Sequence, residues 1–207
     1  MEYKLVPIEK LRALEQVFPN HLKNLKEMIY RDGVMKYALI VEKEHNIVLD
    51  GSHRHIFLAM EGYKLAPVHY VDYKNPYIQV GTVLSHRFLI EDQTGISKEE
   101  VIKRGVSGNL FPPRTTRHFF PFRKSVDIDV PLPKLKQGKP LDVIGHIADV
   151  DIQEEIDHNK KYIQEIEEET DIIIHYLEEG RKTKKYLCKQ VEEMEKQHKE
   201  EKLEVKI

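Results

Sequence analysis

The 207-residue sequence has one cysteine, Cys188, and no tryptophan. A single cysteine excludes a disulfide within the chain and any zinc site built from several cysteines, and it is typical of a reducing compartment. The sequence also lacks a run of 18 apolar residues and an apolar segment near its first residue. We therefore predict a cytoplasmic protein that neither crosses nor uses a membrane.

An excess of charge of one sign is also missing, because 33 Lys and Arg face 35 Asp and Glu. A net charge of −2 argues against nonspecific binding of nucleic acid. The charge is nevertheless unevenly distributed, since residues 151–207 are acidic and the preceding 150 are weakly basic. This change of composition predicts a folded domain at 1–145 and a charged helical tail at 146–207.

Short elements of alternating type fill the first part of the chain. Hydrophobic patterns predict strands at 3–8, 37–42, 46–51 and 66–73. Helices are predicted at 20–33 with Asn20 as its cap, at 52–62, and at 97–105 with Ser97 capping and Gly105 ending it. The segment 110–122 contains three prolines and is predicted to be a structured loop. These elements indicate a small mixed α/β domain.

The tail has a different pattern, because apolar residues recur at spacings of 3, 4 and 7 from Ile152 to Met194. This spacing is typical of helices, and Gly180 interrupts it near the middle. Two interpretations follow, a helical hairpin or a coiled-coil arm, and the second would allow a homodimer through the tail.

The stretch "LDGSHRH" at 49–55 gathers chemically active side chains behind a buried strand. Gly51 permits a sharp turn into a helix, and the free N–H groups of the first helical turn attract anions. Ser52, His53 and Arg54 add donors at that place, while Asp50 suits a phosphate that carries Mg²⁺. The same pattern also fits an ordinary strand–helix turn that is capped by Asp50 and flanked by exposed basic side chains.

A second cluster follows Pro112 and Pro113. Thr115 and Thr116 can donate hydrogen bonds to phosphate oxygens, and the Arg117 guanidinium can donate two hydrogen bonds to the same phosphate. An ordinary basic surface loop explains this pattern equally well. Glu15 lies between the first strand and the first helix, and a lone glutamate of this kind is usually a solvated surface residue.

Together these segments resemble a known group of proteins. "VLDGSHRHIFLAMEGYKLAPVHYVDY" resembles the D-G-H-H-R stretch of the ParB/sulfiredoxin-like superfamily, with Ser52 in place of the first histidine. Within that superfamily the sequence is most similar to the free L-serine kinases, which combine this stretch with an early E-Q and a late T-T-R-H. The sequence has Glu15-Gln16 and "PRTTRHFFPF" in the same order.

The resemblance implies a compact mixed-sheet ParB/sulfiredoxin-like fold with a C-terminal helical extension. It implies a kinase that transfers the terminal phosphoryl group of ADP or ATP, with Mg²⁺, to the hydroxyl of free L-serine, giving O-phospho-L-serine. Glu15 corresponds to the catalytic base, and Asp50 to a catalytic group that binds the metal. The resemblance assigns the nucleotide phosphates to seven residues: Gly51, Ser52, His53, Arg54, Thr115, Thr116 and Arg117. His53 is also counted as catalytic, and His118 is placed near the acceptor.

Three other interpretations of the sequence are open. A non-catalytic ParB-like protein that binds nucleotide or DNA would need a helix-turn-helix domain and a CTP-binding motif, and the sequence shows neither. A sulfiredoxin-like reductase would need a reactive cysteine in the first cluster, where Ser52 stands. A regulatory protein with an inactive kinase site would use the helical tail to bind a partner. The sequence does not distinguish ADP from ATP, and it does not identify the residue that binds the acceptor's carboxylate.

Overall fold

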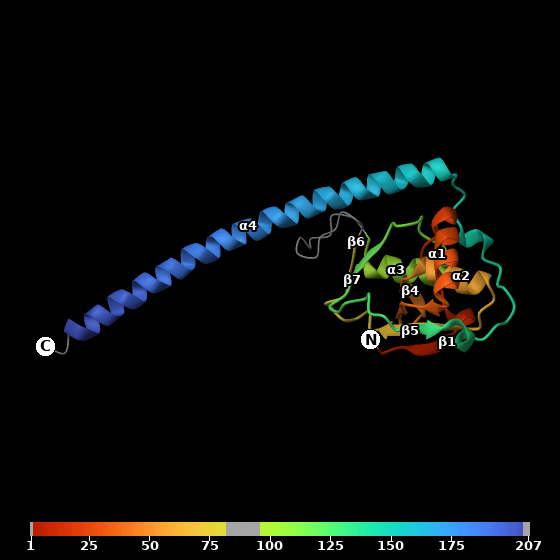
Figure 1. Ribbon diagram of the computed structural model, residues 1–207, viewed down its shortest axis with the longest axis horizontal. Helices are drawn as coiled ribbons and strands as arrows, with labels where there is room; N and C mark the ends of the chain where they lie inside the picture. Colours follow the sequence, from red (N-terminus) through yellow and green to blue (C-terminus); the bar gives the residue numbers. More distant parts are fainter. Residues whose placement is uncertain (1, 82–95, 205–207) are drawn as a thin grey trace. The chain divides into compact units, whose positions relative to one another are not determined.

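A four-stranded mixed sheet forms the centre of the computed structural model, which describes residues 2–81 and 96–204. Its strands stand in the order β1-β5-β3-β4, and Figure 1 labels β1, β5 and β4. The strands are β1 (Lys4–Pro7), β5 (Leu65–Val71), β3 (Leu39–Glu42) and β4 (Ile47–Asp50). The pair β3–β5 is parallel, whereas β1–β5 and the hairpin β3–β4 are antiparallel. The predicted α/β class with a mixed sheet is therefore confirmed.

Both faces of the β3–β4 hairpin are buried, which explains why its sequence is an almost continuous apolar run. Leu39 and Val41 point into one hydrophobic cluster, which also contains Phe57 of helix α2. Ile40 and Leu49 point into a second cluster on the other face. The site described below lies where this doubly covered hairpin ends.

Helix α1 (Pro19–Asp32) begins one residue before the predicted start, with Pro19 in its first turn. The prediction that Asn20 caps it is wrong, because Phe18 holds the cap position and makes no side-chain hydrogen bond there. Instead, the N–H groups of Asn20 and His21 donate to the Glu155 carboxylate at 3.0 and 2.9 Å. A distant carboxylate therefore satisfies the free donors and complements the helix dipole.

Helix α2 (Ser52–Met60) follows β4 directly, as predicted. Helix α3 (Lys98–Ser107) also begins as predicted, because Ser97 accepts a hydrogen bond from the Glu100 N–H. The predicted end at Gly105 is wrong, and Gly108 caps the helix instead. Gly105 serves close packing, since an added Cβ would lie 2.6 Å from Ile47 Cδ1. A glycine inside a helix was therefore mistaken for a helix end.

Short pairings complete this part of the chain. Strand β6 (Gln79–Gly81) pairs with β7 (Arg117–Phe119), and β2 (Val34–Met35) pairs with β8 (Val130–Pro131). Three 3-10 helices add single turns: η1 (Ile8–Lys10), η2 (Leu132–Leu135) and η3 (Ile144–His146). The prediction of a pure loop at 110–122 is wrong in part, because β7 lies inside it. Proline rules out regular structure only at its own positions, and 117–119 contains none.

The tail is one helix, α4 (Ile152–Glu204), so the hairpin interpretation is wrong. One glycine costs a helix only about 1 kcal/mol, and Gly180 stands between Glu and Arg, which favour helices. Residue contacts divide the chain into two compact units, Met1–Tyr162 and Ile163–Ile207. The domain boundary at residue 145 stays a prediction. Among the described residues, no helix is long and apolar enough to cross a membrane.

The packing of Gly105 generates a stability prediction. Gly105→Ala should destabilise the protein by about 1–3 kcal/mol, because the added methyl group collides with Ile47. Gly180→Ala is the matched control, since no atom lies within 4 Å of its added Cβ and alanine favours the helix. Denaturation followed by circular dichroism measures both variants, and a Gly105→Ala protein as stable as the wild type would refute this packing.

Candidate active site

The turn between β4 and α2 is built on a glycine that no other residue can replace without strain. Gly51 has a φ of 98°, in the left-handed region. An added Cβ would also lie 2.8 Å from Leu39 Cδ2 and 2.9 Å from Arg54 Nη2. The turn sets Ser52 at the first position of α2, so the N–H groups of the first helical turn gather beside Asp50.

Asp50 and Arg54 form an ion pair at this turn. Arg54 Nη2 donates to Asp50 Oδ2 at 2.9 Å, and Arg54 Nη1 donates to the Ala38 carbonyl at 3.0 Å. Lys124 Nζ donates to the other oxygen, Asp50 Oδ1, at 2.6 Å. Burial alone would raise the pKa of Asp50, but Lys124 and Arg54 outweigh it and hold the pKa below its usual value. Asp50 is therefore an ionised carboxylate inside a positively charged frame.

Glu15 reaches the same region from a segment 35 residues earlier in the sequence. The backbone at Glu15 pairs with Phe111 in a parallel bridge, in which the Gln16 N–H donates to the Phe111 carbonyl at 2.9 Å. The Phe111 N–H donates to the Leu14 carbonyl at 3.0 Å. This bridge holds the early E-Q segment beside the late T-T-R-H segment.

The contact between Glu15 and Thr116 joins the two predicted segments chemically. Glu15 Oε1 accepts hydrogen bonds from the Thr116 backbone N–H and from Thr116 Oγ1, the latter at 2.6 Å. Burial raises the pKa of Glu15 to about 7, although the bonds from Thr116 oppose the rise, and the negative charge of Asp50 adds to it. Glu15 is therefore a carboxylate poised to exchange a proton near neutral pH.

His53 attaches the start of α2 to the segment that carries Glu15. The Phe18 N–H donates to His53 Nε2 at 3.1 Å, so the single ring proton of the neutral imidazole resides on Nδ1. Burial, together with His21 and Arg114, lowers the pKa of His53 to about 3. His53 is therefore a neutral ring held in a fixed orientation, 4.2 Å from the His21 ring between centroids.

His118 lies deeper than the sequence suggested. It is 8% exposed on β7, and Tyr73 Oη lies 3.0 Å from its Nε2. Burial lowers its pKa to about 3, although the nearby negative charge of Asp50 opposes the shift. The ring is neutral and packs beside Phe120. Its predicted contact with the acceptor stays a prediction.

Thr115 and Arg117 are less closely joined to the cluster. Thr115 Oγ1 donates to the Pro112 carbonyl at 2.9 Å rather than to Glu15. The Arg117 guanidinium lies over the Phe119 ring, 5.0 Å from its centroid. The structure thus brings together Glu15, Asp50, Arg54 and Thr116, with Gly51 and Ser52 at the turn and His53 and His118 packed around it.

Two basic residues that the sequence analysis did not assign to the site belong to this region. Lys124 binds Asp50, as described above. Arg114 donates to Asn159 Oδ1, lies over the rings of Phe18 and Tyr162, and contributes to the lowered pKa of His53. Both residues fall within eight positions of Thr116, and that proximity in sequence is the signal that could have identified them.

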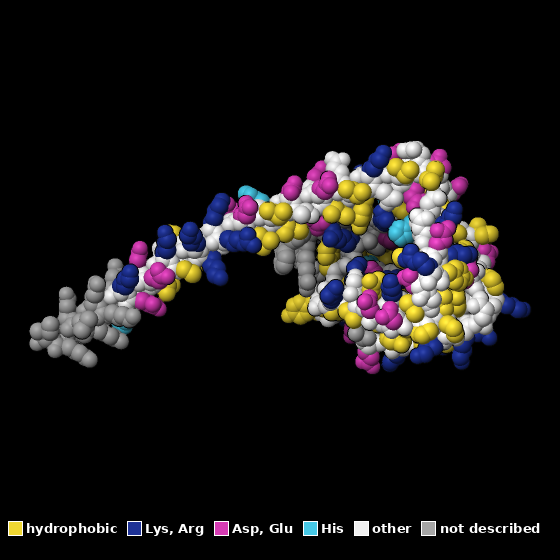
Figure 2. All heavy atoms as spheres, in the orientation of Figure 1, with side chains coloured by type: hydrophobic (Ala, Val, Ile, Leu, Met, Phe, Trp, Pro, Cys, Tyr) yellow, Lys and Arg dark blue, Asp and Glu magenta, His cyan; other side chains and the backbone are white. Residues whose placement is uncertain are grey.

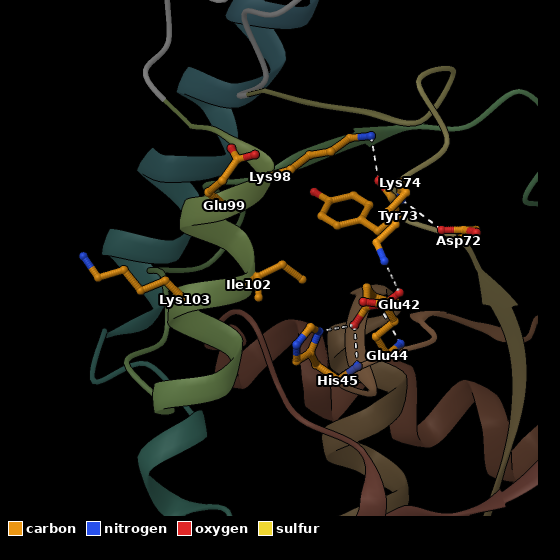
Figure 3. A pocket seen from close by; sticks show the side chains of 10 residues that line it. All are labelled: Glu42, Glu44, His45, Asp72, Tyr73, Lys74, Lys98, Glu99, Ile102 and Lys103. Carbon is orange, nitrogen blue, oxygen red and sulfur yellow. Dashed lines mark hydrogen bonds and ion pairs between the residues drawn. The ribbon is translucent and has the colours of Figure 1, made fainter.

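A separate polar pocket of about 600 Å³ lies between the β3–β4 turn, the end of β5 and α3 (Figure 3). Ligand atoms of Glu42, Glu44 and His45 lie within 4.8 Å of one another there. The Glu42 carboxylate, however, accepts the N–H groups of Glu44 and His45 at 2.6 and 2.7 Å, which fixes the turn.

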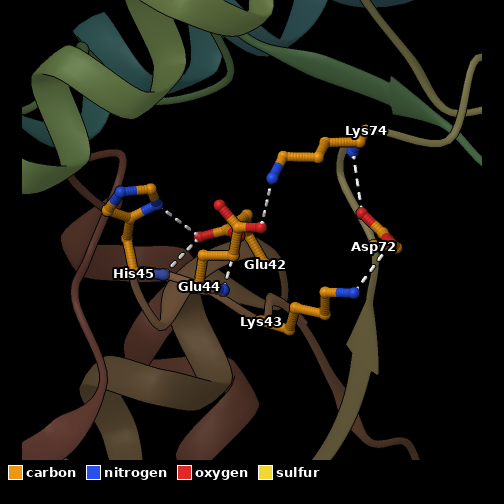
Figure 4. A network of polar contacts seen from close by, with 6 residues as sticks. All are labelled: Glu42, Lys43, Glu44, His45, Asp72 and Lys74. Atoms are coloured by element: carbon orange, nitrogen blue, oxygen red, sulfur yellow. Dashed lines mark hydrogen bonds and ion pairs between the residues drawn. The ribbon is translucent and has the colours of Figure 1, made fainter.

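Two ion pairs lie beside this turn (Figure 4). Lys74 binds Glu44 at 2.8 Å, and Lys43 binds Asp72 at 2.7 Å. We interpret this network as structural, because its acids hold a turn and neighbouring lysines. The candidate active site therefore remains the cluster around Glu15 and Asp50.

Comparison with known proteins supports the fold. No model of a known protein family matches the sequence. A curated ATP-dependent L-serine kinase from Staphylothermus marinus is 31% identical over 86 residues, which is 40% of this chain. The matched segment spans only 34% of that relative's length.

Solved structures extend the comparison. A free serine kinase with ADP, in a glutamate-to-alanine variant, superposes with a TM-score of 0.57 and 17% identity, over 65% of this chain and 94% of that one. A free serine kinase with AMP gives a TM-score of 0.57 and 18% identity, with the same coverage. C-terminally truncated SbnI from Staphylococcus aureus gives 0.51 and 19%, over 78% of this chain and 95% of that one. The chain therefore has the fold of these proteins.

The Glu15–Thr116 contact predicts a measurable titration. In protein with ¹³C-labelled glutamate, the carboxyl signal that disappears in Glu15→Gln should titrate near pH 7. Thr116→Val should raise that midpoint, because it removes a hydrogen bond that favours the carboxylate. Thr115→Val is the control and should leave it unchanged, since Thr115 binds Pro112. A wild-type midpoint near 4.5 would contradict the buried environment of Glu15.

Proposed function

We propose that the protein is a nucleotide-dependent kinase that phosphorylates the hydroxyl of free L-serine and forms O-phospho-L-serine. The observation that carries this proposal is the direct contact of Glu15 with Thr116 beside the ionised Asp50. It unites three segments that are distant in the sequence in the combination typical of free serine kinases. The relative named as an ATP-dependent L-serine kinase and the neighbours bound to ADP and AMP support the same reaction.

The nucleotide phosphates would bind at the first turn of α2. Free N–H groups and the positive end of the helix dipole attract anions there, so this turn replaces a phosphate-binding loop. Gly51 lets the backbone approach the ligand, and Ser52 adds a hydroxyl at the first helical position. Lys124 supplies a positive charge that is half exposed and therefore accessible to a phosphate. The donor is ATP or ADP.

Asp50 is the residue that would hold magnesium. Its carboxylate is ionised and 23% exposed, and each oxygen has lone pairs beyond those used by Arg54 and Lys124. Mg²⁺ in phosphoryl-transfer sites is commonly held by one or two carboxylates and the substrate phosphates, so this donor set fits. When bound, the ion would neutralise phosphate charge. Arg54 keeps the carboxylate in a fixed orientation.

Glu15 is the proposed general base. It would accept the proton of the serine hydroxyl while that oxygen forms a bond to the terminal phosphorus, and the bond from phosphorus to the leaving nucleotide oxygen breaks. A pKa near 7 suits this role, because the base is unprotonated in part at neutral pH yet strong enough to take a proton. His53 would support the step by fixing the Phe18 end of the Glu15 segment against α2.

The substitution Glu15→Gln tests this assignment. We expect phosphoserine formation to fall about 10²–10⁴-fold, because the amide cannot accept the proton. Nucleotide binding should change little, since the first turn of α2 and Asp50 are intact. Mass spectrometry of reactions with Mg²⁺, each nucleotide and a panel of amino acids measures the product, and calorimetry measures binding. Glu27→Gln, on the exposed face of α1, is the matched control and should remain active.

Two outcomes would count against the proposal. Turnover by Glu15→Gln at the wild-type rate would remove Glu15 from the role of base. A wild-type protein that forms no phosphorylated amino acid with either nucleotide would refute the kinase itself.

The pH dependence of the reaction follows from the pKa of Glu15. The base must be unprotonated, so kcat/KM should fall about tenfold per pH unit below 7 and level off above it. The kinetic midpoint should equal the titration midpoint of Glu15, and Thr116→Val should move both upward together. A rate that stays constant from about pH 5.5 to 8 would show that another group takes the proton.

A further inference from the structure

The part of α4 beyond Tyr162 carries a regular apolar stripe. Reading every third and fourth residue from Ile163 gives ten positions, the a and d positions of a heptad repeat. Seven of them are apolar: Ile163, Ile166, Ile173, Leu177, Leu187, Val191 and Met194. The remaining three are Thr170, Gly180 and Lys184. The ten positions span more than four heptads, and apolar residues lie on both sides of the gap at Gly180 and Lys184.

This stripe is exposed. Six of its seven apolar residues keep from 36% (Ile166) to 67% (Met194) of their surface accessible, and the seventh, Ile173, is half-buried. Figure 2 shows hydrophobic side chains recurring along the helix between charged ones. A long helix gains most of its stability by packing an apolar face, so a partner that covers this stripe is expected.

The pattern matches a second copy of the same helix. In a parallel, in-register pair each position meets itself, and seven of the ten layers are apolar on both sides. In an antiparallel pair over the same span, with 163 opposite 194, Leu177 meets Gly180 and Lys184 meets Ile173. Antiparallel pairing therefore buries a charge against an isoleucine and leaves leucines without apolar neighbours.

The size of the stripe is also sufficient for a dimer. The 32 residues from 163 to 194 extend about 48 Å, at about 1.5 Å per residue. A contact strip about 10 Å wide then covers roughly 500 Å² on each helix and roughly 1,000 Å² in the pair. This area meets the lower limit of about 1,000 Å² for a specific interface.

We propose that residues 163–194 form a parallel, in-register, two-stranded coiled coil that joins two copies of this chain. Lys184 at an a position specifies the register, because two lysines meet in the middle of the seam and are tolerated only where their charged ends reach water. Gly180 leaves the same region thinly packed. The dimer is held by the layers on either side of this weak centre, and it does not depend on the proposed kinase activity.

Sedimentation equilibrium of the full chain over a hundredfold concentration range tests the association. We expect a dimer, and we expect Leu187→Glu and Val191→Glu to weaken it roughly 100-fold or more, because each buries a pair of carboxylates. Lys189→Glu is the matched control on the outer face and should stay within a few-fold of the wild type. Lys184→Leu should tighten the dimer roughly tenfold by filling the centre of the seam.

A disulfide tests the orientation. In a Cys188→Ser background, Leu187→Cys places one thiol in a d layer, where parallel copies bring the two thiols within bonding range. Oxidation should then give a covalent dimer. Circular dichroism of each variant confirms that the helix persists. A helical protein that stays monomeric, a dimer insensitive to the seam substitutions, or a dimer of the Leu187→Cys variant that does not cross-link would overturn the proposal.

Discussion

The bridge between Glu15 and Phe111 is the interaction on which the candidate site depends. Neither segment belongs to the central sheet, yet the backbone N–H and carbonyl of Phe111 bind Leu14 and Gln16, the residues on either side of Glu15. The bridge places Thr116 five residues further on, within reach of the Glu15 carboxylate. Without it, the two motifs would be independent loops, and a buried carboxylate would lose the donors that permit its burial.

Two carboxylates of similar intrinsic acidity meet opposite environments in this site. Asp50 contacts two cations and has a pKa below its usual value, whereas burial raises the pKa of Glu15 although Thr116 donates hydrogen bonds to it. The negative charge of Asp50 itself disfavours ionisation of Glu15. This division gives one permanently charged group and one that can exchange a proton, which are the two functions that phosphoryl transfer to a hydroxyl requires.

Features that depend on local sequence pattern could be predicted from the sequence. Features that depend on contacts between distant segments could not. Short apolar runs predicted the central strands, and "LDGSHRH" predicted the turn, because strand, glycine and helix start are adjacent in the chain. The prediction that Gly105 ends α3 is wrong because this glycine is needed for packing against Ile47, which lies 58 residues away in the sequence. The sequence does not identify Lys124 and Arg114 as site residues, because their partners, Asp50 and Asn159, become neighbours only in the folded chain. The T-T-R-H segment was identified through a resemblance, since its spacing alone fits any basic loop.

Composition predicts a domain boundary near residue 145, whereas residue contacts place the boundary after Tyr162. The first turns of α4 show why the two differ. The acidic composition there is typical of a solvated helix, yet Glu155 is buried and caps α1, and Asn159 holds Arg114. Arg114 lies over Phe18, whose N–H fixes His53. A continuous series of contacts therefore runs from α4 through the Thr116 loop to the first turn of α2. An acidic residue that completes a helix cap stabilises the folded unit whatever the net charge of its segment. The acidic composition of 146–162 therefore does not indicate whether this segment packs against the rest of Met1–Tyr162.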